Sequence, residues 1–96
     1  MSMPQDNVYK ETIKEQIREI ERRLSIRREA AAYWMRMIEL AKHSIQTFYP
    51  DPYEDITIGD YIADLEEARF CFNSACDDIH RMKKERNELQ RKQSQL

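Results

Sequence analysis

The sequence is poor in the residues that interrupt regular structure. It has one glycine and three prolines among 96 residues, and two of the prolines, Pro50 and Pro52, lie close together. Because Gly59 stands alone, the chain has no glycine-rich loop of the kind that cradles phosphate groups. Ala, Leu, Ile, Glu, Lys and Arg dominate instead, and this composition is typical of long helices.

Long apolar runs are also missing. The longest uninterrupted apolar stretch, residues 30–35, is far shorter than the ~20 residues that cross a bilayer. The first residues, MSMPQDNVYKE, lack the basic start and apolar stretch of a secretion signal. We therefore expect a cytoplasmic protein that does not bind a membrane.

Cysteine is scarce and the charges nearly balance. In a helix, Cys71 and Cys76 would lie about 140° apart around the axis, which disfavours a disulfide between them. We expect both thiols to be reduced, as is usual in the cytoplasm. The 18 acidic and 16 basic residues give a net charge of -2. Net charge alone therefore predicts no bulk attraction to nucleic acid or to an anionic membrane.

Apolar residues recur at alternating steps of three and four along two long stretches. This heptad pattern is typical of helices that pack against each other along their length, and one arginine interrupts each seam, Arg27 in the first and Arg86 in the second. The first seam runs through Ile13, Ile17, Ile20, Leu24, Arg27, Ala31, Trp34, Ile38, Ala41, Ile45 and Phe48. The second runs through Ile58, Tyr61, Leu65, Ala68, Phe72, Ala75, Ile79, Met82, Arg86 and Leu89.

A short polar segment separates the two stretches. The prolines of YPDPYED end the first helix, and Thr57 and Asp60 have the spacing of a capping box that starts the second. We expect helices over residues 7–48 and 58–93 and a loop over 49–57. Since so short a loop joins antiparallel neighbours, the predicted fold is an all-α, long antiparallel two-helix hairpin that forms one domain over residues 1–96.

The hairpin predicts which residues meet. Folding the chain about residue 53 sets Phe48 against Ile58 and places Arg23 opposite Glu85. The apolar pair and the oppositely charged pair follow from the same register. This independent agreement supports the hairpin.

A second apolar stripe lies beside the first seam. Its members are Ile26, Ala30, Tyr33, Met37 and Leu40. Packing in the hairpin uses only one seam on each helix, and the sequence has no third long element. We therefore predict that a second copy covers this stripe, in a dimeric four-helix bundle or a higher symmetric oligomer with Trp34 near its centre.

Candidate catalytic and metal-binding groups are few. Cys76, Asp77 and His80 lie close together in a helical pattern, but a di-metal helical bundle needs several acids facing inward and neither seam contains one. We interpret His80 as a solvated residue and Cys76 as a small apolar filler. His43 has no cysteine or obvious nucleophile as a partner. We expect no enzymatic activity, no metal ion and no cofactor.

Charge is segregated along the predicted hairpin. Residues 49–67 contain seven acids and no Lys or Arg, whereas residues 81–92 contain six bases and two acids. The turn is therefore acidic and the open end basic. A solvated surface explains such runs, but acids beside aromatic residues also suit a partner's basic groove. The predicted partner-binding residues are Asp51, Tyr53, Glu54, Asp55 and Phe70.

The seam arginines have two interpretations. Arg27 and Arg86 can fix the register while their long stems reach water. Alternatively, they line a pocket for a phosphate or a small nucleotide-like ligand, because guanidinium donors suit oxygen geometry. The predicted residues of such an anion site are Arg22, Arg23, Arg27, Lys83, Lys84 and Arg86.

These patterns favour a non-enzymatic helical protein–protein interaction module. Such a protein would act as a small oligomeric adaptor or inhibitor that occupies the surface of another protein, which the sequence does not identify. The alternative is an oligomeric bundle that sequesters a small anion or nucleotide-like ligand through the basic cluster. Nucleic-acid binding comes third, because no base-stacking aromatic residues are interleaved with the arginines.

Overall fold

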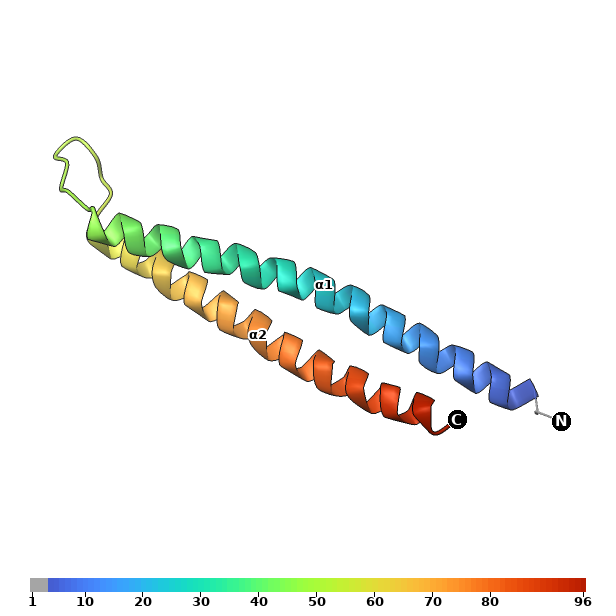
Figure 1. The fold of residues 1–96 in the computed structure, drawn as a ribbon. Coiled ribbons are helices and arrows are strands. Elements are labelled where there is room, and N and C mark those ends of the chain that lie inside the picture. The colour runs from blue at the N-terminus through green and yellow to red at the C-terminus, as the bar shows by residue number, and fades with distance from the viewer. Residues whose placement is uncertain (1–3) are drawn as a thin grey trace.

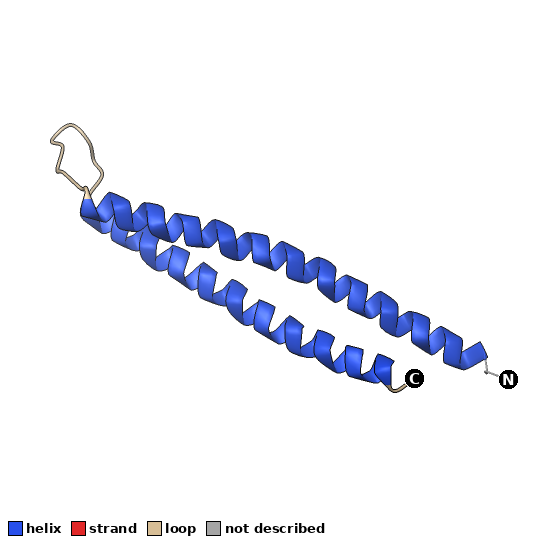
Figure 2. Cartoon of the chain, in the orientation of Figure 1, coloured by secondary structure: helices blue, strands red, loops and turns tan. Residues whose placement is uncertain are grey.

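The protein is a long helical rod. The computed structural model describes residues 4–96, with side chains from residue 8 onward. Helix α1 spans Pro4–Gln46 and helix α2 spans Ile58–Ser94. The two helices run antiparallel and side by side in a hairpin of 80 × 17 × 13 Å, with both chain ends away from the turn (Figure 1). The described residues form helices and loop only, which confirms the predicted all-α hairpin (Figure 2).

The ends of α1 differ slightly from the expected bounds. The helix begins at Pro4 instead of residue 7, and proline suits a first helical turn because its missing N–H has no partner there. At the other end α1 stops at Gln46, two residues before Phe48. The hydroxyl of Thr47 donates to the His43 carbonyl at 2.8 Å, and Pro50 follows soon after. Proline disfavours helical geometry in the preceding residue, so the chain leaves the helix before Pro50.

Helix α2 begins at Ile58, as the sequence predicts. The Asp60 carboxylate accepts the backbone N–H of Thr57 at 2.7 Å and the hydroxyl of Thr57 at 3.3 Å. The backbone N–H of Asp60 donates to the Thr57 carbonyl at 3.1 Å. The short Asp side chain therefore suffices for the carboxylate half of the capping box, in which Glu is more usual. This cap determines where the turn ends.

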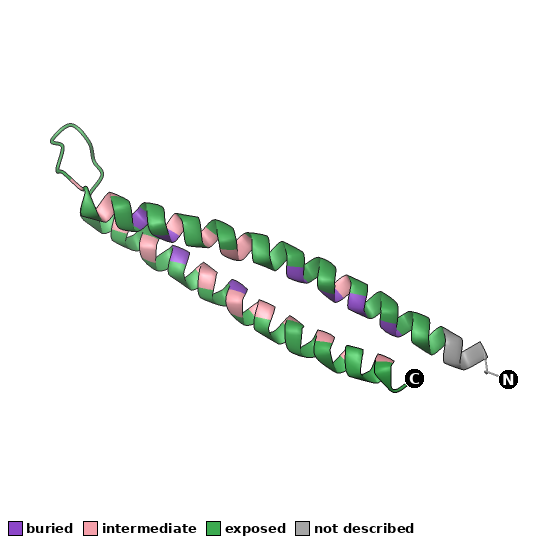
Figure 3. Ribbon diagram, in the orientation of Figure 1, coloured by how far each residue is buried: buried purple, intermediate pink, exposed green. Residues whose placement is uncertain are grey.

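The core is the seam between the helices. Eight residues are buried among those with described side chains, and all eight are apolar and belong to the two predicted seams: Ile13, Ile17, Ile20, Leu24, Ile38, Ala41, Ala68 and Ala75. In Figure 3 the buried segments are spread along α1 and lie in the half of α2 toward the turn, whereas the turn itself is almost wholly exposed. The seam is one residue wide on each helix, so the hairpin has no interior beyond it.

An aromatic pair packs next to the turn. The ring of Phe48 meets Tyr61 edge to face, with 6.0 Å between ring centroids. Ile58 is left exposed at the first position of α2. Edge-to-face contacts between aromatic rings are favourable beyond the area they bury. The aromatic pair therefore closes the turn end of the seam.

A matched pair of substitutions tests the seam as the main source of stability. Ile20 is 5 % exposed in the seam, whereas Ile62 is 42 % exposed. We expect Ile20→Ala to lower the free energy of unfolding by about 2–5 kcal/mol, because it removes buried methyl groups and leaves a cavity. Ile62→Ala should cost less than about 1 kcal/mol. Urea unfolding at one protein concentration measures both values, and equal losses would contradict a core confined to the seam.

Candidate interaction surfaces

The second apolar stripe predicted from the sequence lies on α1 and remains uncovered in the hairpin, and we call it the α1 stripe. Ile26 is 51 % exposed and Leu40 is 58 % exposed, and Tyr33 is exposed between them. Ala30 and Met37 are half-buried. Because burial of apolar surface is the main force in association, a row of this kind on one helix is a candidate contact surface.

An aromatic pair stands at the middle of this stripe. The rings of Tyr33 and Trp34 meet edge to face, with 5.0 Å between centroids and 78° between planes. Trp34 is half-buried in the seam, and Tyr33 lies beside it on the stripe. The seam thus supports the stripe at its centre and holds the tyrosine ring in a defined position.

Three hollows open between the helices on the same side of the rod. Their volumes are about 620, 540 and 250 Å³. On both helices, most of the residues that line these hollows stand one position before a seam residue in the sequence. Since one residue step turns a helix by about 100°, these positions share one side of an antiparallel pair. We call it the stripe side, because the α1 stripe lies on it.

The two walls of the stripe side differ in chemistry. In the smallest of the three hollows, α1 contributes Met37 and Leu40, whereas α2 contributes Asp64 and Glu67. In the middle hollow, Ile26 of α1 faces a wall of α2 that includes charged side chains, among them Asp78, Arg81 and Glu85. In these two hollows the α2 residues that stand one position before the seam are all charged, although seam residues of α2 also line them, and α1 adds Arg23 and Arg27 to the middle hollow. The apolar stripe over residues 26–40 of α1 therefore lies opposite charged positions of α2.

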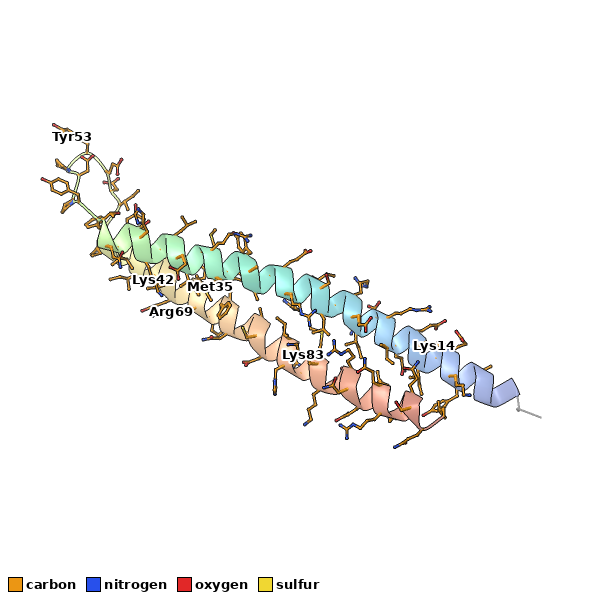
Figure 4. The ribbon with its side chains drawn as sticks, in the orientation of Figure 1. Lys14, Met35, Lys42, Tyr53, Arg69 and Lys83 are labelled. Atoms are coloured by element: carbon orange, nitrogen blue, oxygen red, sulfur yellow. The ribbon has the colours of Figure 1, made fainter. Side chains whose placement is uncertain are left out.

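The turn forms an exposed acidic tip, which we define as residues 49–57. Tyr49 is 85 % exposed and Tyr53 is 95 % exposed, and Figure 4 shows Tyr53 at the extremity of the rod. The turn nevertheless has local order. The Asp51 carboxylate accepts the backbone N–H of Tyr53 at 2.9 Å, and the N–H of Glu54 donates to the Asp51 carbonyl at 3.2 Å. The tip presents two aromatic rings among the carboxylates of Asp51, Glu54 and Asp55.

Phe70 does not join the tip. It is 74 % exposed on α2, twelve positions after Ile58. At 1.5 Å per residue, it lies about 18 Å along the helix from the turn. The predicted partner-binding residues therefore divide into the acidic tip and one separate aromatic side chain.

The arginines of the predicted anion site are mostly engaged with carboxylates. Arg22 and Arg23 both bond to Glu19, at 2.6 and 3.1 Å. The hydrogen bond from Arg22, assisted by its charge and by Arg23, lowers the pKa of Glu19 to about 2. Arg23 pairs with Glu19 on its own helix. Arg23 and Glu85 nevertheless line the same two hollows, so they lie on the same side of the groove, as the predicted register places them.

The two seam arginines have different environments. Arg27 is half exposed, and its Nε lies 3.3 Å from Asp78 Oδ2 on α2, so the pair bridges the helices. Asp78 also pairs with Arg81 on its own helix. Arg86 is half-buried, and its Nε is buried without a hydrogen-bond partner in the described part of the chain. The sequence pattern did not identify Asp78, because it lies beside the seam and reaches Arg27 only through the length of the arginine side chain.

The remaining reactive groups are dispersed. Cys71 and Cys76 are free and half-buried, and His80 is exposed. Within residues 8–96, no three His, Cys, Asp or Glu side chains gather closely enough to hold a metal ion. Lys83 and Lys84 are exposed on α2. Figure 4 shows Lys83 at the surface, in the half of α2 toward the open end.

Replacing Arg86 tests whether this seam position is structural. Arg86→Leu should raise the free energy of unfolding by about 1 kcal/mol, because it exchanges a poorly satisfied guanidinium for a packed apolar side chain. Arg91→Leu, at an exposed position of the same helix, is the control and should not stabilise. Thermal unfolding measures both, and destabilisation by Arg86→Leu would contradict the structural interpretation.

The same variants test the anion-site hypothesis. If Arg86 holds an anion, millimolar phosphate or mononucleotide should raise the melting temperature of the wild type and leave Arg86→Leu unchanged. At a hundred times its dissociation constant, such a ligand contributes roughly 2.7 kcal/mol. No rise with any of these ligands, or a rise that persists in Arg86→Leu, would exclude a site that depends on Arg86.

Neither helix, over the part of the chain described, has a stretch that is both long and apolar enough to span a bilayer. No protein family model, no curated protein and no solved structure matches the chain. Proposals about its function therefore rest on two surfaces of the hairpin, the α1 stripe and the acidic tip.

Proposed function

We propose that the protein is a non-enzymatic helical interaction module that self-associates through the α1 stripe and presents its acidic tip to another protein. In this role it acts as a small adaptor or inhibitor. The observation that carries the proposal is the exposure of Tyr49 and Tyr53 among three carboxylates at the end of an 80 Å rod.

The chemistry of the tip defines the kind of partner. Tyrosine buries a large apolar ring and retains a hydroxyl for hydrogen bonding, and for this reason tyrosine is enriched at interfaces. Asp51, Glu54 and Asp55 lie in the same exposed turn as the rings and favour a basic surface, because opposite charges steer two proteins toward each other. The tip therefore suits a partner with a basic groove that accepts one or two aromatic rings.

The rod supports this use of the tip. The cap at Thr57 and Asp60 and the ring pair of Phe48 and Tyr61 hold both ends of the turn. A turn anchored on a rigid element loses less conformational freedom on binding than a free segment does. The contact between the tip and its partner uses no seam residue. Substitutions at the tip can therefore weaken partner binding without unfolding the hairpin.

Charge reversal at the tip tests the proposal. We expect Asp51→Lys, Glu54→Lys and Asp55→Lys together to reduce partner capture from extracts of the producing cells more than tenfold, because they reverse the attraction to a basic surface. The control carries Glu21→Lys, Glu29→Lys and Glu66→Lys, which make the same change in net charge at exposed helix positions. Quantitative mass spectrometry of the captured proteins compares these variants with the wild type.

Two further measurements accompany this test. Circular dichroism should show that both triple variants keep their helices, because none of the six positions is buried. Tyr53→Ala alone should also weaken capture. Unchanged capture by the tip variant, or equal loss with the control, would refute a partner contact at the tip.

A further inference from the structure

We infer that two copies pack α1 against α1 in antiparallel orientation, with Tyr33 at the two-fold axis and the two acidic tips on opposite sides of that axis. The inference rests on the self-association proposed above and adds the orientation. It does not depend on the identity of the tip's partner.

The difference between the two walls of the stripe side decides which helices meet. If α1 of one copy lay on α2 of the other, Met37 and Leu40 would press against the wall that carries Asp64 and Glu67. Burying unpaired carboxylates against apolar side chains is costly. Contact between the two α1 stripes buries apolar surface on both sides, so α1 packs on α1.

The spacing of the stripe fits an antiparallel contact. Counted from Tyr33, Ile26 lies seven residues before and Leu40 seven after, while Ala30 and Met37 lie three before and four after. The stripe therefore has nearly the same pattern when it is read backward. A two-fold axis through Tyr33 places Ile26 against the partner's Leu40 and Ala30 against the partner's Met37, as a self-complementary interface requires.

The charges oppose the parallel alternative. In a parallel dimer, the seven acids of residues 49–67 would lie beside the same seven acids of the second copy. In the antiparallel dimer, each turn end lies alongside the open half of the other copy. There, residues 81–92 carry six bases and two acids, and residues 18–28 carry five arginines and two acids. Opposite charges then face each other at both ends, so electrostatics sets the direction.

The geometry has a functional consequence. From Tyr33 to Gln46 is thirteen residues, or about 20 Å of helix, so the two turn ends of α1 lie about 40 Å apart. The other half of α1 is longer, because Pro4 lies 29 residues, or about 44 Å of helix, from Tyr33. The open half of each copy therefore extends past the tip of the other, and the dimer carries two tips, one on each side of the axis.

Cysteine cross-linking tests the orientation. The background is Cys71→Ser with Cys76→Ser, and Tyr33→Cys, Ile26→Cys or Leu40→Cys is added one at a time. Under mild oxidation, Tyr33→Cys should form a covalent dimer, whereas Ile26→Cys and Leu40→Cys should not. In the proposed dimer, residue 26 of one chain lies about 21 Å along the helix from residue 26 of the other chain, and the same separation holds for residue 40. A disulfide needs Cα atoms within about 7 Å, so neither position can cross-link to itself. An equal mixture of Ile26→Cys and Leu40→Cys chains should cross-link.

The mixture keeps Tyr33, so it remains informative even if Tyr33→Cys weakens the dimer. Phe70→Cys is the control, because Phe70 is exposed on α2 and should not cross-link. Self-cross-linking of Ile26→Cys and Leu40→Cys would show a parallel dimer and refute the orientation while leaving self-association intact. No cross-link at any stripe position, alone or mixed, would refute both the orientation and self-association through the stripe.

Discussion

The apolar seam between α1 and α2 is the interaction on which the rest of the structure depends. Each helix contributes one row of residues at alternating steps of three and four, and burial is confined to that row. Helices of this length gain most of their stability from packing an apolar face, and not from intrinsic helix propensity. The seam therefore aligns the two helices, closes the turn and determines which residues remain outside.

Two features follow from this narrow core. Because the seam uses one row on each helix, the α1 stripe is left exposed beside it, with Tyr33 supported by the half-buried Trp34. The seam also ends at Phe48 and Tyr61, so the acidic tip projects beyond the last packed layer. The stripe and the tip lie at different places on the rod.

Much of the fold could be predicted from the sequence, because heptad spacing, prolines and a helix cap act through local geometry. The eight buried residues all lie in the predicted seams, and α2 begins where Thr57 and Asp60 predict. The sequence pattern did not predict two contacts that depend on how far, and in which direction, a side chain extends. Phe48 turns to Tyr61 because aromatic rings attract edge to face. Arg27 bonds to Asp78 because a long guanidinium side chain can leave the seam and find a carboxylate beside it.

The candidate sites could be predicted only in part. The α1 stripe follows from periodicity, and its exposure in the hairpin agrees with the pattern. The anion site was predicted from basic residues alone, and the structure shows Arg22, Arg23 and Arg27 paired with carboxylates. Spacing does not reveal such pairings, because each acid has several bases within reach along a helix. The polar wall of α2 opposite the stripe became evident only from the arrangement of both helices.

Sedimentation equilibrium at micromolar concentration tests the central claim, that the hairpin needs a second copy to cover the α1 stripe. The account predicts a mass of at least twice the 11.6 kDa of one chain. It also predicts a lower mass for Tyr33→Glu combined with Met37→Glu, because charges on the stripe oppose its burial. A folded wild-type monomer of 11.6 kDa throughout this range would contradict the account.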